Sequence, residues 1–187
     1  MSGSAKRPAT YEDLLALPEH KVGEIIDGEL IVSPRPAPRH AHASSRLGGV
    51  LDGPFYRGSG GGPGGWIILD EPELHHRGDV LVPDLAGWRR ERLPRLPDAA
   101  YFELAPDWIC EVLSPSTETV DRAKKMRIYA REGVQHAWLI NPINRTLEVF
   151  RLTGGEWLLA DTLHSEGVAR IEPFDAIDLD VTSLWAD

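Results

Sequence analysis

Cysteine is nearly absent from this sequence, since Cys110 is the single one among 187 residues. An intrachain disulfide is therefore excluded, and we expect a reducing compartment. No stretch approaches the roughly 18 consecutive apolar residues of a membrane-spanning helix. The first residues also lack the apolar segment of a signal peptide. These absences predict a cytoplasmic protein that has no membrane span.

Basic residues are also scarce, because 20 Lys and Arg face 29 Asp and Glu, which gives a formal net charge of −9. Proteins that grip duplex DNA usually carry a basic patch, since phosphate contacts supply most of the non-specific affinity. A nucleic-acid-binding function therefore requires that the basic residues gather around one cleft, or that metal cations neutralise acidic groups in the site.

The length suits a single domain, which we place at residues 10–187 after a flexible tail at 1–9. Pro83 interrupts the apolar run 80–88, which fits an edge strand or a bulge better than a central strand. The alternation of strand and helix patterns predicts an α/β or α+β domain. We expect helices at 11–18, 40–51 and 119–132, a hairpin at 22–32, and strands at 66–69, 80–88, 108–113, 137–140, 146–152 and 157–162.

Two acidic residues occur in apolar strand patterns. Glu111 lies inside the run 108–113, where an ionised carboxylate is costly unless the strand end is exposed or a metal, lysine or arginine compensates its charge. Asp84 follows Pro83, where a turn residue is the commoner interpretation. As a pair from neighbouring strands, however, the two carboxylates match the oxygen ligands that Mg²⁺ prefers.

The predicted helix after Glu111 carries Asp121, Lys125 and Tyr129 at intervals of four, so the three side chains share one face. Such an Asp–Lys pair usually stabilises a solvated helix face. Its position directly after the strand of Glu111 favours a functional site. The histidine pairs 40/42 and 75/76 lack zinc-motif spacing, so we expect ordinary surface histidines, with His40 a partial exception.

Several of these residues also carry a family resemblance, which extends from about residue 11 to about residue 152. The chain resembles the bacterial Uma-two type family, a restriction-endonuclease-like group within the PD-(D/E)XK nuclease superfamily. The resemblance rests on Glu24-Ile-Ile-Asp-Gly-Glu-Leu30, Val82-Pro-Asp84, Glu111-Val-Leu-Ser-Pro-Ser-Thr117, Asp121, Lys125, Tyr129 and Gly133-Val134.

This resemblance implies a restriction endonuclease-like core, in which a mixed β-sheet is flanked by helices. It implies that Asp84 and Glu111 bind Mg²⁺ or Mn²⁺ and that Lys125 completes the catalytic group. The accessory residues that it implies are Glu24, His40, Asp121 and Tyr129.

The chain departs from the superfamily and family patterns at three positions. Leu113 stands where the superfamily usually has a lysine; Lys125 is the replacement that the resemblance implies, and Lys124 is a weaker candidate. Ala137 and Asn141 stand where the family often has tyrosine and aspartate. These two changes affect finer details of the site and leave the metal pair intact.

The function that follows from the resemblance is a metal-dependent endonuclease that acts on nucleic acid, with DNA as the expected substrate and a homodimer as the expected assembly. The acidic balance and Leu113 favour an alternative, a catalytically degenerate nuclease fold that serves as an interaction or scaffold protein. A glycoside hydrolase with two carboxylates ranks last, because a lysine beside the acids is not part of that chemistry.

Overall fold

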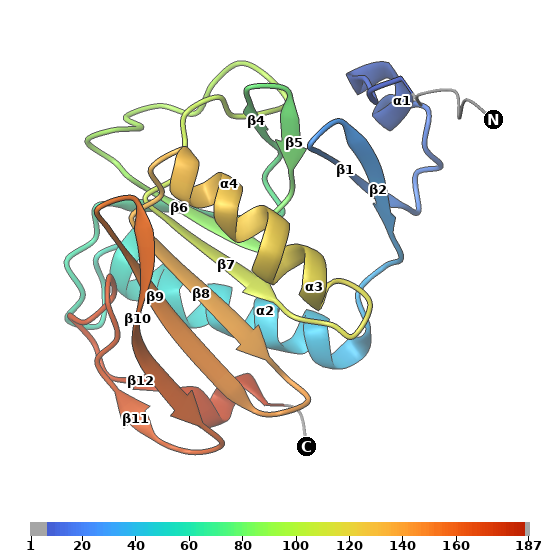
Figure 1. Ribbon diagram of the computed structural model, residues 1–187. Coiled ribbons are helices and arrows are strands. Elements are labelled where there is room, and N and C mark those ends of the chain that lie inside the picture. Colours follow the sequence, from blue (N-terminus) through green and yellow to red (C-terminus); the bar gives the residue numbers. More distant parts are fainter. Residues whose placement is uncertain (1–6, 186–187) are drawn as a thin grey trace.

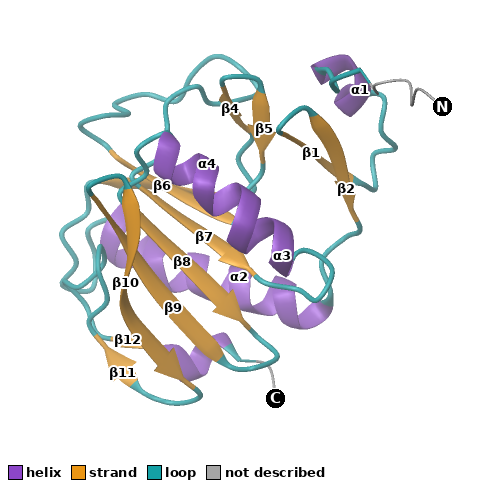
Figure 2. Ribbon diagram, in the orientation of Figure 1, coloured by secondary structure: helices purple, strands orange, loops and turns teal. Residues whose placement is uncertain are grey.

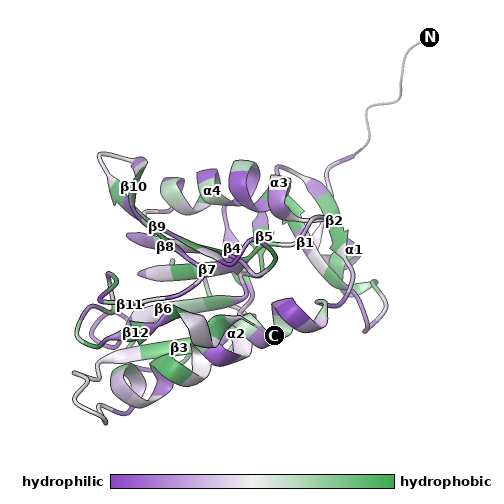
Figure 3. Ribbon diagram, turned by 90° about the horizontal axis from the view of Figure 1, so that it is seen from below, coloured by the Kyte–Doolittle hydropathy of each residue, from purple (hydrophilic) through white to green (hydrophobic). Residues whose placement is uncertain are grey.

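A six-stranded mixed sheet lies between two layers of helix in the computed structural model, which describes residues 7–185 (Figure 1). Its strand order is β10-β9-β8-β7-β6-β3, and β7 and β8 are its one parallel pair in the described chain. α2 covers one face, and α3 and α4 cover the other (Figure 3). This arrangement confirms the predicted mixed sheet flanked by helices. The strands are β3 (Trp66–Asp70), β6 (Leu85–Arg89), β7 (Trp108–Val112), β8 (His136–Asn141), β9 (Thr146–Thr153) and β10 (Glu156–His164).

A smaller antiparallel sheet stands beside the large one, with the order β2-β1-β5-β4. Its first hairpin turns at Asp27 and Gly28, whose φ values of 53° and 75° are those of a tight two-residue hairpin turn, as the Asp-Gly pair predicted. The four strands are β1 (Val22–Ile26), β2 (Glu29–Ser33), β4 (Leu74–His76) and β5 (Asp79–Leu81).

Helices and short elements complete the chain (Figure 2). None of the helices in the described part is long and apolar enough to cross a membrane. They are α1 (Tyr11–Leu15), α2 (Pro38–Leu51), the π-helical turn η1 (Asp52–Tyr56), α3 (Glu118–Val120), the π-helical turn η2 (Asp121–Lys125), α4 (Met126–Arg131), strands β11 (Val168–Ala169) and β12 (Leu179–Asp180), and the 3-10 turn η3 (Val181–Leu184).

Strand β7 is buried along its whole length, as its apolar run predicted. Alternate side chains enter two different cores because successive residues of a strand point to opposite faces. Trp108, Cys110 and Val112 join the cluster on the α2 side. Ile109 belongs to the cluster on the α4 side. The period of two therefore aims Glu111 toward the helical segment that carries Lys125.

The apolar run 80–88 is divided between the two sheets, so the prediction of one interrupted strand was wrong. Its first part is β5 of the small sheet and its second part is β6 of the large sheet. Pro83 lies in the connection between the two strands, where no sheet hydrogen bond requires the N–H that proline lacks. The chain therefore crosses from sheet to sheet immediately before Asp84.

The predicted helix at 119–132 is confirmed as the helical segment 118–131, with the π-helical turn η2 in its middle. Residues 1–6 of the predicted tail lie outside the described residues. At the other end of that tail, the Ala9 N–H donates to the carbonyl of Gly28. The tail and the single-domain boundary therefore stay predictions.

Candidate active site

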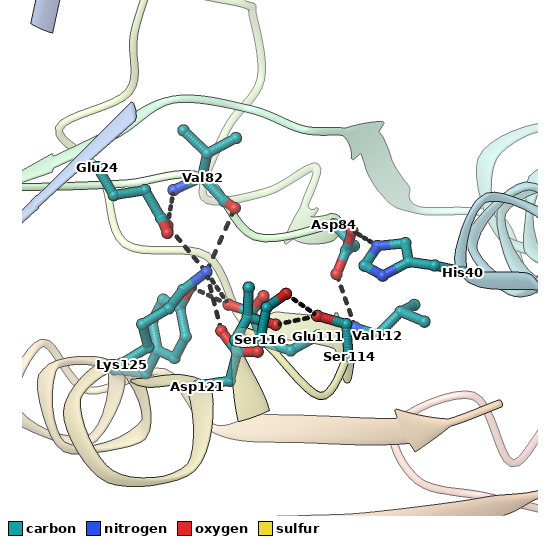
Figure 4. Close-up of polar contacts among 12 residues, drawn as sticks. Glu24, His40, Val82, Asp84, Glu111, Val112, Ser114, Ser116, Asp121 and Lys125 are labelled. Atoms are coloured by element: carbon teal, nitrogen blue, oxygen red, sulfur yellow. Dashed lines mark hydrogen bonds and ion pairs between the residues drawn. The ribbon is translucent and has the colours of Figure 1, made fainter. Parts of the chain in front are cut away.

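A pocket of about 300 Å³ opens between β1 of the small sheet and the end of β7 in the large one. It is lined by six of the seven side chains that the sequence singled out, and the seventh, Tyr129, lies behind Glu111. Both sheets, the start of α2 and the turn η2 contribute to it (Figure 4). The six are Glu24, His40, Asp84, Glu111, Asp121 and Lys125.

Asp84 and Glu111 meet because β6 and β7 are antiparallel neighbours. Leu85 pairs with Cys110, and one further step of that register places Asp84 opposite Glu111. Asp84 is held at both carboxylate oxygens. Its Oδ2 accepts from the Val112 N–H at 2.7 Å, and its Oδ1 lies 2.5 Å from Nε2 of His40. Both acids therefore line the same pocket, and their role as metal ligands stays a prediction.

Lys125 is the central cation of the pocket, and only 3% of its side chain is exposed. Its Nζ lies 2.8 Å from Glu24 and 2.8 Å from Glu111, and 3.7 Å from Asp121. It also donates to the carbonyl of Val82 at 3.4 Å. The lysine thus joins acids from both sheets.

The turn η2 gives this arrangement its local geometry. It spans Asp121–Lys125 with π-helical hydrogen bonding, which often occurs at functional sites. One turn later Tyr129, fully buried, donates its hydroxyl to Oε1 of Glu111 at 2.5 Å. Glu111 is therefore oriented by a phenol and an ammonium group from one helical segment.

Burial and crowding of like charges decide the electrostatics of the pocket. Burial raises the pKa of Glu111 well above its ordinary value, and Asp121, Asp84 and Glu24 raise it further against the opposing effect of Lys125. Burial also raises the pKa of Asp121. For Lys125, burial opposes the charged form, but Glu111 and Glu24 outweigh it and hold the pKa well above normal. The pocket therefore carries more carboxylates than its one ammonium compensates.

Within residues 7–185 no three His, Cys, Asp or Glu side chains are arranged to hold a metal ion. Mg²⁺ does not require such a cage, because it keeps several waters and commonly binds through one or two carboxylates. Asp84 and Glu111, which both line the pocket, supply such oxygen ligands. A hydrated divalent cation therefore fits the donor set and the excess of negative charge.

The three residues that depart from the family pattern do not line the pocket, and neither does Lys124. Leu113 is 1% exposed and packs in the apolar cluster on the α4 side. Lys124 points elsewhere and pairs with Glu29 at 2.7 Å. Oδ1 of Asn141 accepts hydrogen bonds from the N–H groups of Ile143 and Asn144 in the turn after β8.

Sequence reasoning missed three features of the pocket and its surroundings. The backbone of Val82 donates to Glu24 at 2.8 Å and accepts from Lys125, and no side-chain pattern could have signalled this. Glu71 lines the pocket with a positive φ of 45°, a strained backbone for a non-glycine residue. Outside the pocket, the expectation that His76 lies on the surface was wrong, because it is 4% exposed.

Comparisons with known proteins agree with this architecture. Residues 8–182 match the family model Uma2, described as "Putative restriction endonuclease". The crystal structure of a "putative nuclease belonging to DUF820" from Anabaena variabilis is similar with a TM-score of 0.75 and 25% identity, over 95% of this chain and 98% of that one. No curated protein sequence matches the chain. Since the family model spans nearly the whole sequence, the chain belongs to the Uma2 family of restriction-endonuclease-like proteins.

Proposed function

We propose that this protein hydrolyses phosphodiester bonds of nucleic acid, with DNA as substrate, at a divalent metal (Mg²⁺ or Mn²⁺) held by Asp84 and Glu111. Family membership and the nuclease-like fold support a nuclease. The observation that carries the metal-dependent mechanism is that two acids, distant in sequence, line one pocket together with the buried ammonium of Lys125.

The chain's own groups divide the work in this proposal. A divalent cation would supply Lewis acidity toward a phosphate oxygen and lower the pKa of a bound water. Val112 and His40 fix the Asp84 carboxylate, and Tyr129 fixes that of Glu111. Lys125 stays protonated and places a positive charge where negative charge develops in the transition state.

His40 takes the part of a proton carrier in the same scheme. Its imidazole lies on the first turns of α2, lines the pocket and contacts Asp84, so it is close to the reacting groups. An imidazole ring can accept a proton at one nitrogen and donate one from the other. Glu24 and Asp121 act through Lys125 and hold its ammonium in place.

The direct test replaces Asp84 by Ala and measures Mg²⁺-dependent cleavage of plasmid DNA and of circular single-stranded DNA. Cleavage should fall by about 100-fold or more, since even outer partners of a metal ligand commonly cost 10- to 100-fold. Asp52→Ala is the matched control, because Asp52 is partly exposed and pairs with Arg57 outside the pocket. Unchanged cleavage by Asp84→Ala would remove the proposal.

A scaffold role for a catalytically degenerate fold is the second candidate. The burial of Leu113 at the superfamily lysine position and the net charge of −9 favour it. Calorimetry distinguishes the two candidates. Binding of Mn²⁺ that disappears in Asp84→Ala supports the hydrolase, and absence of Mg²⁺ and Mn²⁺ binding supports the scaffold.

A further inference from the structure

A second hollow of about 240 Å³ adjoins the pocket along α2, and we call the two together the groove. They share Pro36, His40, Glu71 and Asp84. His40 and Asp84 therefore border both hollows of the groove. A chain-like substrate can pass over these residues with neighbouring units on either side.

Acidic side chains dominate the lining of this groove. The described lining has two cationic side chains, Arg35 and Lys125. Lys125 is already paired with carboxylates and almost fully buried. The acids are Glu24, Asp70, Glu71, Asp84, Glu111 and Asp121. One cation is therefore left to meet a substrate phosphate.

Arg35 is that cation. It is exposed, and its guanidinium has no hydrogen-bond or ion-pair partner among residues 7–185. Pro34 and Pro36 flank it, and because each proline fixes its own φ, they stiffen the segment that presents the arginine at the pocket. A planar guanidinium recognises a phosphate through two parallel hydrogen bonds.

The acids themselves lie deep. The side chain of Asp84 is 14% exposed and that of Glu111 is 3% exposed. Proteins that hold duplex DNA by its backbone commonly neutralise about 6 to 10 phosphates. This groove offers one unpaired cation, and its small volume suits a strand whose nucleotides can leave the stack.

We propose that the groove takes a single-stranded nucleic acid segment and that Arg35 binds a phosphate next to the one at Asp84 and Glu111. This assignment of substrate class rests on the proposed nuclease function. Arg35 acts as a substrate-binding residue and takes no part in the bond-breaking step. Duplex is a poor ligand because the deeply placed acids are reached only by nucleotides that have left the stack.

Fluorescence anisotropy of the full chain with a labelled oligothymidylate, and with the corresponding duplex, tests this proposal. Ca²⁺ is present as a divalent ion, and the dissociation constants are followed between about 50 and 200 mM salt. The single strand should bind at least about tenfold more tightly than the duplex. For the single strand, a plot of the logarithm of the binding constant against the logarithm of the salt concentration should have a slope of about −0.7 to −1.4. This is the value for one or two phosphate contacts on a single strand.

Three variants test whether Arg35 makes the contact with the phosphate. Arg35→Gln should weaken binding about tenfold and make the salt slope less steep by about 0.7. Arg35→Lys should keep the salt slope, since the charge remains. Arg46→Gln is the matched control on α2, because Arg46 is exposed and lies outside both hollows, and it should bind like the wild type.

Equal or tighter binding of duplex, a slope steeper than about −4, an unaffected Arg35→Gln variant, or failure to bind either oligonucleotide each overturns the proposal. Cleavage that depends on Asp84, without single-strand preference, leaves the nuclease function standing and removes only the substrate class. Arg35-dependent binding without any metal-dependent cleavage removes the hydrolase instead.

Discussion

Replacing Lys125 by Met is the most informative perturbation of the buried charge cluster. Methionine has a similar length and fills the same space without a charge. Glu24, Glu111 and Asp121 would then lose their shared cation while they remain 9%, 3% and 5% exposed. We therefore expect a large loss of stability in the absence of metal.

The size of the loss follows from the burial. Removing one partner of a buried ion pair costs about 3–5 kcal/mol, because an uncompensated charge stays behind. For a chain of this length, 1 kcal/mol corresponds to about 2–4 °C in Tm, so the variant should melt about 6–20 °C lower. Lys124→Met is the control, since its pair with Glu29 is 38% and 68% exposed and contributes less than about 1 kcal/mol.

Thermal melts by circular dichroism at neutral pH with a chelator provide the measurement. Adding Glu24→Gln to Lys125→Met should recover part of the loss, because one buried charge disappears while the amide oxygen can still accept the Val82 N–H. A Lys125→Met variant that melts within about 2 °C of the wild type would refute the compensation argument.

Tyr129→Phe should lower the free energy of unfolding by about 1.5–3 kcal/mol, because Glu111 loses a charge-assisted hydrogen bond; urea denaturation measures this, and a change below 0.5 kcal/mol would contradict it. Burial lowers the pKa of His76, so below about pH 6.5 the unfolded chain binds a proton that the folded chain does not. The free energy of unfolding therefore decreases as the pH is lowered. His76→Gln should make this fall less steep, and parallel pH curves would count against it. Leu113→Lys should destabilise by about 3 kcal/mol or more without raising cleavage, because the ammonium would enter an apolar cluster; a stable, more active variant would overturn this.

Local patterns predicted the elements whose geometry is decided locally. Asp27 and Gly28 define their hairpin because both adopt positive φ, which few other residue pairs tolerate. The nearly continuous apolar run around Cys110 identified the central strand, since such a run is typical of burial on both faces. Glu111 stood out for the same reason, as a carboxylate in a place where burial is costly.

Features that depend on distant partners were not predictable in this way. Pro83 is equally compatible with a bulge and with a crossing between sheets, and only the pairing of β5 with β1 decides between them. The π-helical turn at Asp121–Lys125 has no signature in side-chain spacing. His76 was expected at the surface, but the β4–β5 hairpin turns it into the interior.

The chain segment Val82–Asp84 connects the two sheets at the proposed active site. Lys125 forms ion pairs with Glu24 from one sheet and Glu111 from the other, and it donates a hydrogen bond to the carbonyl of Val82 between them. A displacement of the small sheet would therefore change the distances from the Lys125 ammonium group to these carboxylates. Any movement of the β1–β2 hairpin against the large sheet would therefore have to break an ion pair of Lys125.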